Sequence, residues 1–331
     1  MDLRQTFSNS NVLITGGLGF IGSTVAYALV NLGARVTLMD SLIPDYGGNL
    51  FNVDGIKDKI VINITDVRDK NSIRYLVQGQ DYLFNLAGTL SHIDSMQDPY
   101  TDLEINCTSQ LSILEACRHN NLKIKIIFSG TRGQYGRAKY LPVDEKHPME
   151  PIDVNGINNI AGESYHMLYN NVYGIRACSL RMTNTFGPRH QMRHGKQGYL
   201  NWFIRQAMED KPITIYGDGS QLRDFNYIDD VVEALLAAAV KEETNGQVYN
   251  LGSGNSISVL ESAHAVVKAV GRGSIKHVEF PPDKKKIEVD DYYADYGKIH
   301  TALGWKPCVS FEEGLRRTVE YYRQYRHHYW S

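Results

Sequence analysis

The sequence predicts an α/β fold with a doubly wound parallel sheet and a smaller C-terminal α+β lobe. Through residue 182, short apolar segments without alternation recur between segments of helical periodicity, as in buried parallel strands joined by helices. A glycine-rich turn joins the first strand to the first helix, and the regular alternation ends after residue 182. Right-handed crossovers then place helices on both faces of the sheet. We expect units 1–182 and 183–331, with a strand near 225–252 able to return to the first unit.

The overall composition is that of an ordinary soluble protein. The 331 residues are 42% hydrophobic and 22% charged, and a net charge of −2 gives no reason to expect nucleic acid or an anionic membrane as a partner. No apolar run approaches the length of a membrane span, and Met1–Ser10 lacks a signal-peptide core. The four cysteines show neither close pairing nor metal-ligand spacing. We therefore expect reduced thiols, no metal and a cytoplasmic protein.

The first predicted strand, Asn11–Thr15, runs into a glycine turn that opens the helix Ser23–Leu32. Gly16, Gly19 and Gly22 stand at G-x-x-G-x-x-G spacing. Glycines at these positions allow a tight turn, a close approach of a pyrophosphate to the backbone, and close packing of helix on strand. The positive end of the helix dipole then faces the phosphates. This turn predicts a dinucleotide site.

The second predicted strand, Arg35–Met39, ends on Asp40. A carboxylate there accepts hydrogen bonds from an adenosine ribose and repels a 2′-phosphate, which favours NAD over NADP. The alternative is that Asp40 only caps a turn. Residues 41–55 contain several glycines and a proline and are expected to form a loop.

Two further strand ends contribute to the same predicted site. Asp66 and Val67 follow the strand Ile60–Ile64, and Asp66 suits either an adenine amino group or the N-cap of a helix over 70–77. The fourth strand, 81–86, leads into small residues that let the backbone pass beneath a cofactor. The predicted cofactor-binding residues are Gly16, Gly19, Phe20, Ile21, Gly22, Asp40, Asp66, Val67, Leu86, Ala87 and Gly88.

The other elements follow from periodicity and capping signals. Predicted helices span 102–119, 157–172, 200–209, 229–241, 258–270 and 311–323. Predicted strands span 122–129, 175–180, 213–216 and 248–251. Ser258 and Glu261 form a capping box, and the basic run 284–286 is expected to be a solvated loop. A ligand cleft is expected at the carboxyl ends of the strands.

Taken together, these motifs resemble the extended short-chain dehydrogenases/reductases that modify nucleotide sugars, a group of 4-epimerases, 4,6-dehydratases and decarboxylases with a Rossmann-type domain. The resemblance extends over nearly the whole chain. The matching segments are 15–23, 85–88, 184–189, 215–225, 250–254, 294–295 and 303–307. It implies NAD as cofactor, a UDP-sugar as the commonest substrate, and a homodimer built through a four-helix bundle.

The same resemblance assigns a substrate diphosphate to Asn184 and Arg223. A guanidinium suits this role because it grips phosphate oxygens bidentately. Lys285 falls where relatives usually place an arginine, and Glu288 falls near their usual aspartate. The alternative for Arg223 is a surface ion pair with a neighbouring aspartate.

The catalytic motif departs from that of the resembling family. Relatives carry Tyr-x-x-x-Lys on the helix after the fifth strand, and a Ser or Thr at the preceding strand end. Thr131 retains the hydroxyl, but Asn155 and Asn159 occupy the tyrosine and lysine positions. Neither asparagine titrates, so neither is a Brønsted base. Tyr165 and Tyr169 lie at the wrong helical phase for the role.

Neighbouring positions narrow the reaction. Dehydratases that resemble this chain carry Asp-Glu after the threonine, and the decarboxylases carry the glutamate, whereas here Arg132 and Gly133 stand there. A 4-epimerase needs neither acid and is the nearest match. His92, which titrates near neutrality, is a candidate for the missing base, with Asp94 orienting it and Arg132 stabilising an alkoxide. Loop packing or an ion pair is the alternative role for each.

Three functional interpretations therefore stand. The first is an NAD-dependent C4 epimerase or related C4-redox enzyme with a remodelled proton relay. The second is a non-catalytic NAD or nucleotide-sugar binding protein, and the third is a dehydratase or decarboxylase. The dimer helices would be 102–119 and 157–172, which carry apolar residues on more than one face. The residues concerned are Leu111, Ile113, Leu114, Ile160, Met167 and Leu168.

Overall fold

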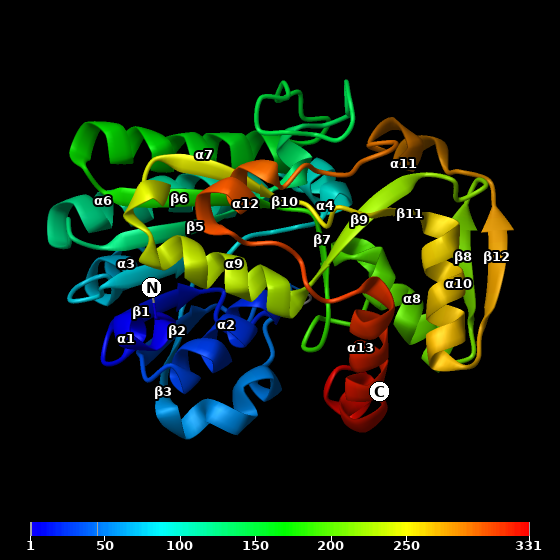
Figure 1. Cartoon of the computed structure of the whole chain (residues 1–331), viewed down its shortest axis with the longest axis horizontal. Coiled ribbons are helices and arrows are strands. Elements are labelled where there is room, and N and C mark those ends of the chain that lie inside the picture. The colour runs from blue at the N-terminus through cyan, green and yellow to red at the C-terminus, as the bar shows by residue number, and fades with distance from the viewer. Residues whose placement is uncertain (1, 45, 331) are drawn as a thin grey trace.

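A seven-stranded parallel sheet forms the centre of the protein (Figure 1). The computed structural model describes residues 2–44 and 46–330. Three residues lie outside the described ranges: residues 1 and 331, at the ends of the predicted units, and residue 45, in the predicted loop. The strand order is β10-β6-β5-β4-β1-β2-β3, with every pairing parallel. The strands are β1 (Asn11–Thr15), β2 (Arg35–Asp40), β3 (Ile60–Ile64), β4 (Tyr82–Asn85), β5 (Lys125–Thr131), β6 (Arg176–Met182) and β10 (Gln247–Leu251).

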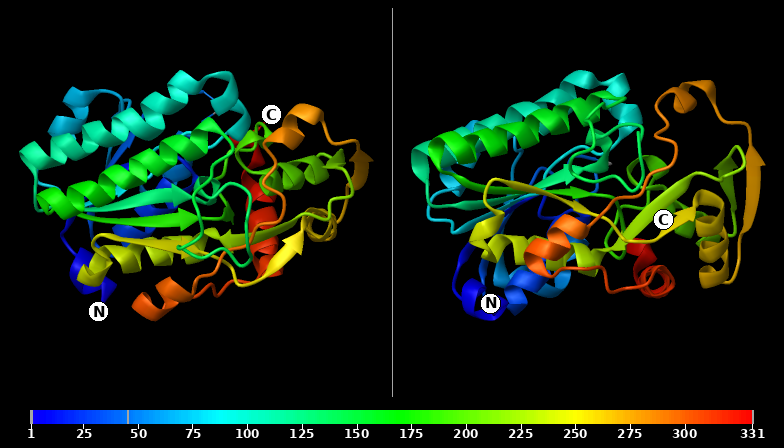
Figure 2. Two further views of the ribbon diagram at one scale, coloured as in Figure 1. Left: turned by 90° about the horizontal axis from the view of Figure 1, so that it is seen from above. Right: turned by 45° about the horizontal axis from the view of Figure 1, so that its top comes forward.

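Helices cover both faces of this sheet, which confirms the doubly wound α/β prediction. On one face lie α2 (Phe20–Asn31) and α9 (Ile228–Val240), which contact each other. On the other lie α3 (Lys70–Leu76), α6 (Ser109–Asn120) and α7 (Val154–Tyr173), with α6 and α7 side by side (Figure 2). Within the described ranges, no helix is both long and apolar enough to cross a membrane.

The C-terminal part of the chain builds a smaller lobe beside the carboxyl ends of the sheet (Figure 1). It holds a three-stranded sheet of order β11-β9-β7 and a parallel pair, β12-β8. The strands are β7 (Asn184–Phe186), β8 (Pro212–Tyr216), β9 (Leu222–Tyr227), β11 (Ser256–Ser258) and β12 (Ser274–Val278). The helices from residue 199 onward, α9 apart, are α8 (Tyr199–Met208), α10 (Val259–Val270), α11 (Pro282–Lys286), α12 (Gly297–Leu303) and α13 (Phe311–Tyr325).

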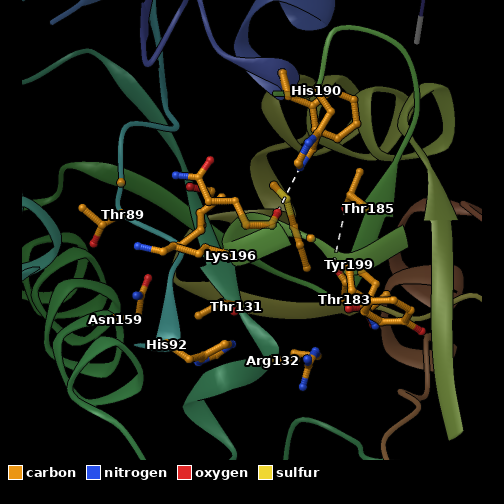
Figure 3. A pocket seen from close by; sticks show the side chains of 18 of the residues that line it. Thr89, His92, Thr131, Arg132, Asn159, Thr183, Thr185, His190, Lys196 and Tyr199 are labelled. Atoms are coloured by element: carbon orange, nitrogen blue, oxygen red, sulfur yellow. Dashed lines mark hydrogen bonds between the residues drawn. The ribbon is translucent and has the colours of Figure 1, made fainter. Parts of the chain in front are cut away.

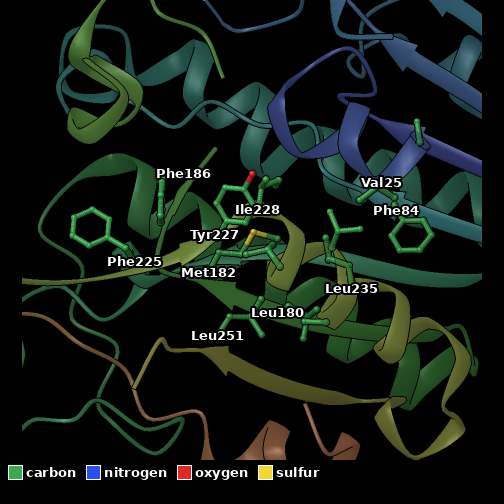
Figure 4. Close-up of a cluster of buried hydrophobic side chains, with 14 of the residues drawn as sticks. Val25, Phe84, Leu180, Met182, Phe186, Phe225, Tyr227, Ile228, Leu235 and Leu251 are labelled. Atoms are coloured by element: carbon green, nitrogen blue, oxygen red, sulfur yellow. The ribbon is translucent and has the colours of Figure 1, made fainter. Parts of the chain in front are cut away.

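One hydrophobic cluster joins the large sheet to the smaller lobe (Figure 4). Leu180 of β6 and Leu251 of β10 belong to it, as do Phe186 and Phe225 of the smaller lobe. The chain returns to the first unit through α9 and β10, which pairs with β6 along residues 247–251. The cavity between the two parts is therefore held by a shared core.

The predicted helix over 102–119 is interrupted. The chain forms α5 (Pro99–Leu103), a π-helical turn (Glu104–Thr108) and then α6. Within the π turn, the side-chain amide of Asn106 accepts from the Thr89 backbone N–H at 3.0 Å and donates to its carbonyl oxygen at 3.2 Å. The distortion thus ties this helix to the segment after β4, a tertiary interaction that local periodicity does not encode.

Other differences concern short elements. The predicted loop 41–55 contains the start of a 3-10 helix, Leu50–Lys59, and the basic run 284–286 lies in α11. The helix α4 (His92–Gln97) was not predicted from the sequence; Ser91 caps it by accepting the Asp94 N–H. Short helices bury few apolar residues and leave little periodic signal.

Candidate active site

Two adjoining cavities open at the carboxyl ends of the central strands, where doubly wound sheets bind ligands. The larger has a volume of about 430 Å³ and the smaller about 130 Å³. They share lining residues from the α2 N-terminus and from the segment Leu86–Gly88. Ligands in the two cavities would therefore meet beside this segment.

The smaller cavity is built on the glycine turn. Gly16 has φ +66, a left-handed conformation that favours glycine. A Cβ on Gly22 would lie 2.2 Å from the carbonyl oxygen of Gly16, so helix and turn pack too closely for any side chain. Gly19 caps α2 without a side-chain hydrogen bond, which leaves the first N–H groups of this helix to a ligand.

Both acidic residues predicted for the dinucleotide lie at this cavity. Asp40 accepts hydrogen bonds from Leu18 N–H at 3.0 Å and Leu42 N–H at 2.9 Å, so it caps the backbone and also faces the cavity. Burial raises the pKa of Asp40, and these two hydrogen bonds offset part of the rise. Asp66 pairs with Arg68 at 2.8 Å. The N-cap of α3 is Asp69, so that alternative for Asp66 is wrong.

All of the predicted cofactor-binding residues line this one cavity. They come from four separate strand ends, which sequence order alone does not bring together. The set is Gly16, Gly19, Phe20, Ile21, Gly22, Asp40, Asp66, Val67, Leu86, Ala87 and Gly88. A phosphate cradle beside a carboxylate fits the pyrophosphate and ribose of a dinucleotide.

The larger cavity contains the predicted hydroxyl. Thr131 ends β5, and its Oγ1 accepts a hydrogen bond from Gly133 N–H at 3.2 Å. Since the backbone donates to this oxygen, its own O–H proton stays available for a ligand. Figure 3 shows Thr131 just above His92 in the view, with Arg132 to the lower right of it.

His92 forms a dyad with an aspartate that the sequence did not single out. Its Nδ1 lies 2.5 Å from Oδ2 of Asp153, a buried residue, while the ring lines the larger cavity. Burial would raise the pKa of Asp153, but the hydrogen bond and charge of His92 bring it below its usual value. Among the described residues, Nε2 of His92 has no hydrogen-bond partner. The dyad thus presents one free imidazole nitrogen.

Asp94, the residue expected to orient His92, has a different partner. It forms an ion pair with Lys196 at 2.8 Å, and Lys196 also lines the larger cavity. The orienting carboxylate is therefore Asp153. Its signal in the sequence was its position at the N-cap of α7, whereas nothing local marked Lys196.

The two asparagines that we predict at the tyrosine and lysine positions differ in environment. Asn155 is 2% exposed, and its amide donates to Thr89 O at 2.8 Å and to Asp102 Oδ2 at 2.9 Å. Asp102 accepts a further bond from Asn158 at 2.7 Å. Asn159 lines the larger cavity and donates to Asn155 O at 2.9 Å. A hydrogen-bonded network therefore fills the tyrosine position.

Of the four predicted diphosphate residues, Asn184 and Glu288 line the larger cavity, whereas Arg223 and Lys285 are not among its lining residues. Asn184 lines it and donates to the Asp224 carbonyl oxygen at 3.0 Å. Arg223 is buried and pairs with Glu288, not with a surface aspartate as the alternative had it. Lys285 is exposed and outside the lining. Its neighbour Lys284 lines the cavity, with Nζ 2.7 Å from Tyr216 Oη.

Of the other residues weighed, His190 lines both cavities. Its ring nitrogens lie 2.7 Å and 3.0 Å from the carbonyl oxygens of Gln191 and Gln197, so it braces a loop. His194 caps the short 3-10 turn that follows. Tyr169 donates to Glu115 at 2.5 Å, outside the cavity lining.

The fold and its two joined cavities define an enzyme of the Rossmann class. Residues 12–252 match the family described as NAD dependent epimerase/dehydratase. A UDP-glucose 4-epimerase of Mycolicibacterium smegmatis is 31% identical, with 94% of this chain and 98% of that protein covered. The chain therefore belongs to the NAD dependent epimerase/dehydratase family.

Solved structures agree with this assignment. An epimerase of Methanothermobacter thermautotrophicus superimposes with a TM-score of 0.92 at 26% identity, over 99% of this chain and 96% of that one. A UDP-glucose 4-epimerase of Thermotoga maritima with UDP-glucose gives 0.87 at 31% identity, over 95% and 99%. The likeness spans both cavities because nearly the whole chain is covered.

Proposed function

We propose that this protein binds NAD in the smaller cavity and a nucleotide sugar in the larger cavity, and that it epimerises the sugar at C4. A UDP-sugar is the nucleotide sugar that we expect. The observation that carries the proposal is the pairing of His92 with Asp153 in the cavity that also holds Thr131. A base can act only within hydrogen-bond reach of the hydroxyl it deprotonates. Within this dyad, the imidazole of His92 lines the same cavity as Thr131, whereas the Asp102 carboxylate that contacts Asn155 is not among the lining residues.

The residues around the smaller cavity fit NAD. The turn at Gly16, Gly19 and Gly22 would hold its pyrophosphate, and Asp40 its adenosine ribose. The negative charge of Asp40 would disfavour the 2′-phosphate of NADP. When bound, NAD would supply reversible acceptance of a hydride from the sugar. Tight retention of the dinucleotide is expected because α2 and four strand ends enclose it.

We assign the proton relay to His92 and Asp153. Nε2 of His92 would take the proton of the C4 hydroxyl as the sugar is oxidised, and would give it back to the 4-keto sugar when it is reduced. Asp153 would hold the imidazole through Nδ1 and stabilise its protonated form. Thr131 would donate a hydrogen bond to the sugar oxygen. Return of the hydride to the opposite face of the keto sugar gives the epimer.

The substrate diphosphate would lie between the two parts of the chain. Asn184, Lys284 and Glu288 line that region, and Arg223 reaches it through its ion pair with Glu288. Binding of a diphosphate would then require that Glu288 share or release the guanidinium. We therefore still propose Arg223 and Asn184 as residues that bind the diphosphate. In the proposed set of diphosphate-binding residues, Lys284 takes the role that was predicted for Lys285.

A labelled-product assay tests the function. Purified protein would first be denatured and its released small molecules identified by mass, and native protein would then be incubated in D₂O with a panel of nucleotide sugars. A C4 epimerase gives the C4 isomer without deuterium on carbon, since the same hydride returns. Deuterium at C5 or C6, or loss of CO₂, would instead identify a dehydratase or decarboxylase.

A second candidate is a binding protein without turnover. The buried network of Asn155 and Asp102 favours it, because this network occupies the position of the usual base. Release of NAD from the protein, together with binding but no isomerisation of every sugar tested, would establish this function instead.

We also propose a homodimer through α6 and α7. Ile157, Leu168 and Val172 are exposed apolar residues on α7, and a partner would cover them. Of the apolar residues named on the two helices, Ile113 and Leu114 belong to the face of α6 that covers the sheet, where both are fully buried in the core.

A further inference from the structure

Arg132 is half-buried, and among the described residues no carboxylate forms an ion pair with it. It lies in the 3-10 turn Arg132–Gln134 after β5 and lines the larger cavity. Its Nη1 is inaccessible to solvent and has no hydrogen-bond partner among the described residues. The guanidinium contacts the face of the Tyr292 ring, 5.4 Å from its centroid. The cation–π contact does not satisfy the buried Nη1 donor group of Arg132.

Two other arginines near the site are paired. Arg181 contacts Glu163 at 2.5 Å, and Arg223 contacts Glu288. An unpaired buried charge is costly, and proteins generally avoid one by supplying a partner. Burial, and then the charge of Arg223, lower the pKa of Arg132, which reflects the same unrelieved desolvation. The partner missing for Arg132 can come from a ligand in the cavity.

The lining favours a ligand anion at this point. Among the lining residues that the structure describes, Glu288 alone carries a carboxylate, and Arg223 holds it. Beside Arg132 in Figure 3 stand Thr183 and Tyr199, which are polar and neutral. Burial raises the pKa of Tyr199 to about 12, so its hydroxyl stays protonated at neutral pH. An anion here meets the Arg132 guanidinium and the Tyr199 hydroxyl. The carboxylates whose charge reaches Arg132 are Glu288, which Arg223 holds, and the buried Asp224, whose pKa burial raises to about 6.

The position of Arg132 points to the sugar. It follows Thr131 directly at the end of β5 in the large sheet, whereas Arg223 comes from β9 in the smaller lobe. A guanidinium presents a planar pair of donors that matches a carboxylate bidentately. We propose that the sugar unit of the substrate carries a carboxylate, as in a nucleotide-linked uronic acid, and that Arg132 binds this carboxylate. This inference rests on the proposed function of the larger cavity as a nucleotide-sugar site.

UDP-glucuronate and UDP-glucose make a matched pair of probes, since they differ only in a carboxylate or a hydroxymethyl group at C6. Calorimetry with the full chain and added NAD would compare both sugars and UDP alone. We expect wild-type protein to bind UDP-glucuronate roughly 10- to 100-fold more tightly than UDP-glucose, as for a charge-assisted hydrogen-bonded pair. A preference for UDP-glucose, or equal affinity, would overturn the proposal without any variant.

Arg132→Met should lower the affinity for UDP-glucuronate to that for UDP-glucose. Arg132→Lys should keep part of the preference for UDP-glucuronate, because lysine keeps the positive charge but lacks the paired N–H donors of the guanidinium. Arg74→Met, at an exposed arginine on α3, is the matched control and should change neither affinity. Equal weakening of both sugars and of UDP by Arg132→Met would place the diphosphate at Arg132 and overturn the proposal. If UDP and both sugars fail to bind wild-type protein, it is the proposed function that fails.

Discussion

The imidazole Nδ1 of His92 lies 2.5 Å from Oδ2 of Asp153, across 61 residues of sequence. His92 opens α4 after the fourth strand, and Asp153 caps α7, the helix that carries the two asparagines. The dyad therefore joins α4 to the N-terminus of the helix on which we predict the two substituted positions, Asn155 and Asn159. The proposed proton relay rests on this relationship.

Replacing His92 by glutamine should remove the base while keeping a polar side chain of similar reach. We expect kcat to fall by roughly 100- to 10,000-fold, the usual contribution of a positioned acid–base group. KM should stay nearly constant because the nucleotide end of the cavity is unchanged. Steady-state kinetics on the sugar identified by the panel measures both. His264→Gln, at an exposed histidine of α10, is the control, and undiminished turnover in His92→Gln would exclude the relay.

Asp153→Asn separates the charge of Asp153 from its role as a helix cap. Oδ1 accepts the Gly156 N–H at 2.7 Å, and an asparagine oxygen can keep this bond. We expect kcat to fall about tenfold or more, because the imidazole loses the partner that orients it. The free energy of unfolding, from urea titration, should change by less than about 1 kcal/mol. Asp153→Ala, which also removes the cap, should show the larger loss of stability. Full activity of Asp153→Asn would remove Asp153 from the relay.

His166 should make the protein sensitive to acid. The ring is fully buried, stacks on Phe128 at 4.4 Å, and lies 2.7 Å from Gly162 O through Nδ1. Burial lowers its pKa to about 4. Between pH 6.5 and 4, His166 is therefore protonated in the unfolded chain but still neutral in the folded chain. The free energy of unfolding consequently falls as the pH falls. The loss approaches about 3 kcal/mol below pH 4.

Urea unfolding across this pH range checks the prediction in wild-type protein and in His166→Gln. Glutamine can still accept from Asn85 Nδ2, which lies 3.3 Å from Nε2 of His166, but it does not titrate. The variant should lose less stability on acidification than wild type does. Parallel curves for the two proteins would contradict the assignment.

The dimer prediction rests on the exposed face of α7. Leu168 is 51% exposed there, and Leu168→Glu would place a charge in the proposed interface. We expect sedimentation velocity to show a dimer for wild type and a monomer, or a much weaker dimer, for the variant. Val61→Glu, at a residue that is 61% exposed on β3, is the control and should leave the dimer intact. A monomeric wild-type protein would disprove the interface.

Much of the fold could be predicted because it depends on interactions between residues that are close in the sequence. The strand Asn11–Thr15 and the strand Ile60–Ile64 have the predicted bounds, since uninterrupted apolar runs end at glycine or polar residues. The glycine turn and Asp40 likewise depend on nearest neighbours in sequence. The break in the helix near Asn106 was missed because a contact with Thr89, not local propensity, causes it.

By itself, the sequence determined the alternation of strands and helices through residue 182 and the glycine turn of the dinucleotide site, and it predicts that asparagines stand at the tyrosine and lysine positions. Only the tertiary structure decided that Asp153 holds His92, that Lys284 lines the cavity in place of Lys285, and that Arg132 is left without a carboxylate. The physical reason is that periodicity and turn chemistry act over a few residues. Ion pairs and cavities instead depend on which strand ends and loops the folded sheet brings within about 3–4 Å of each other.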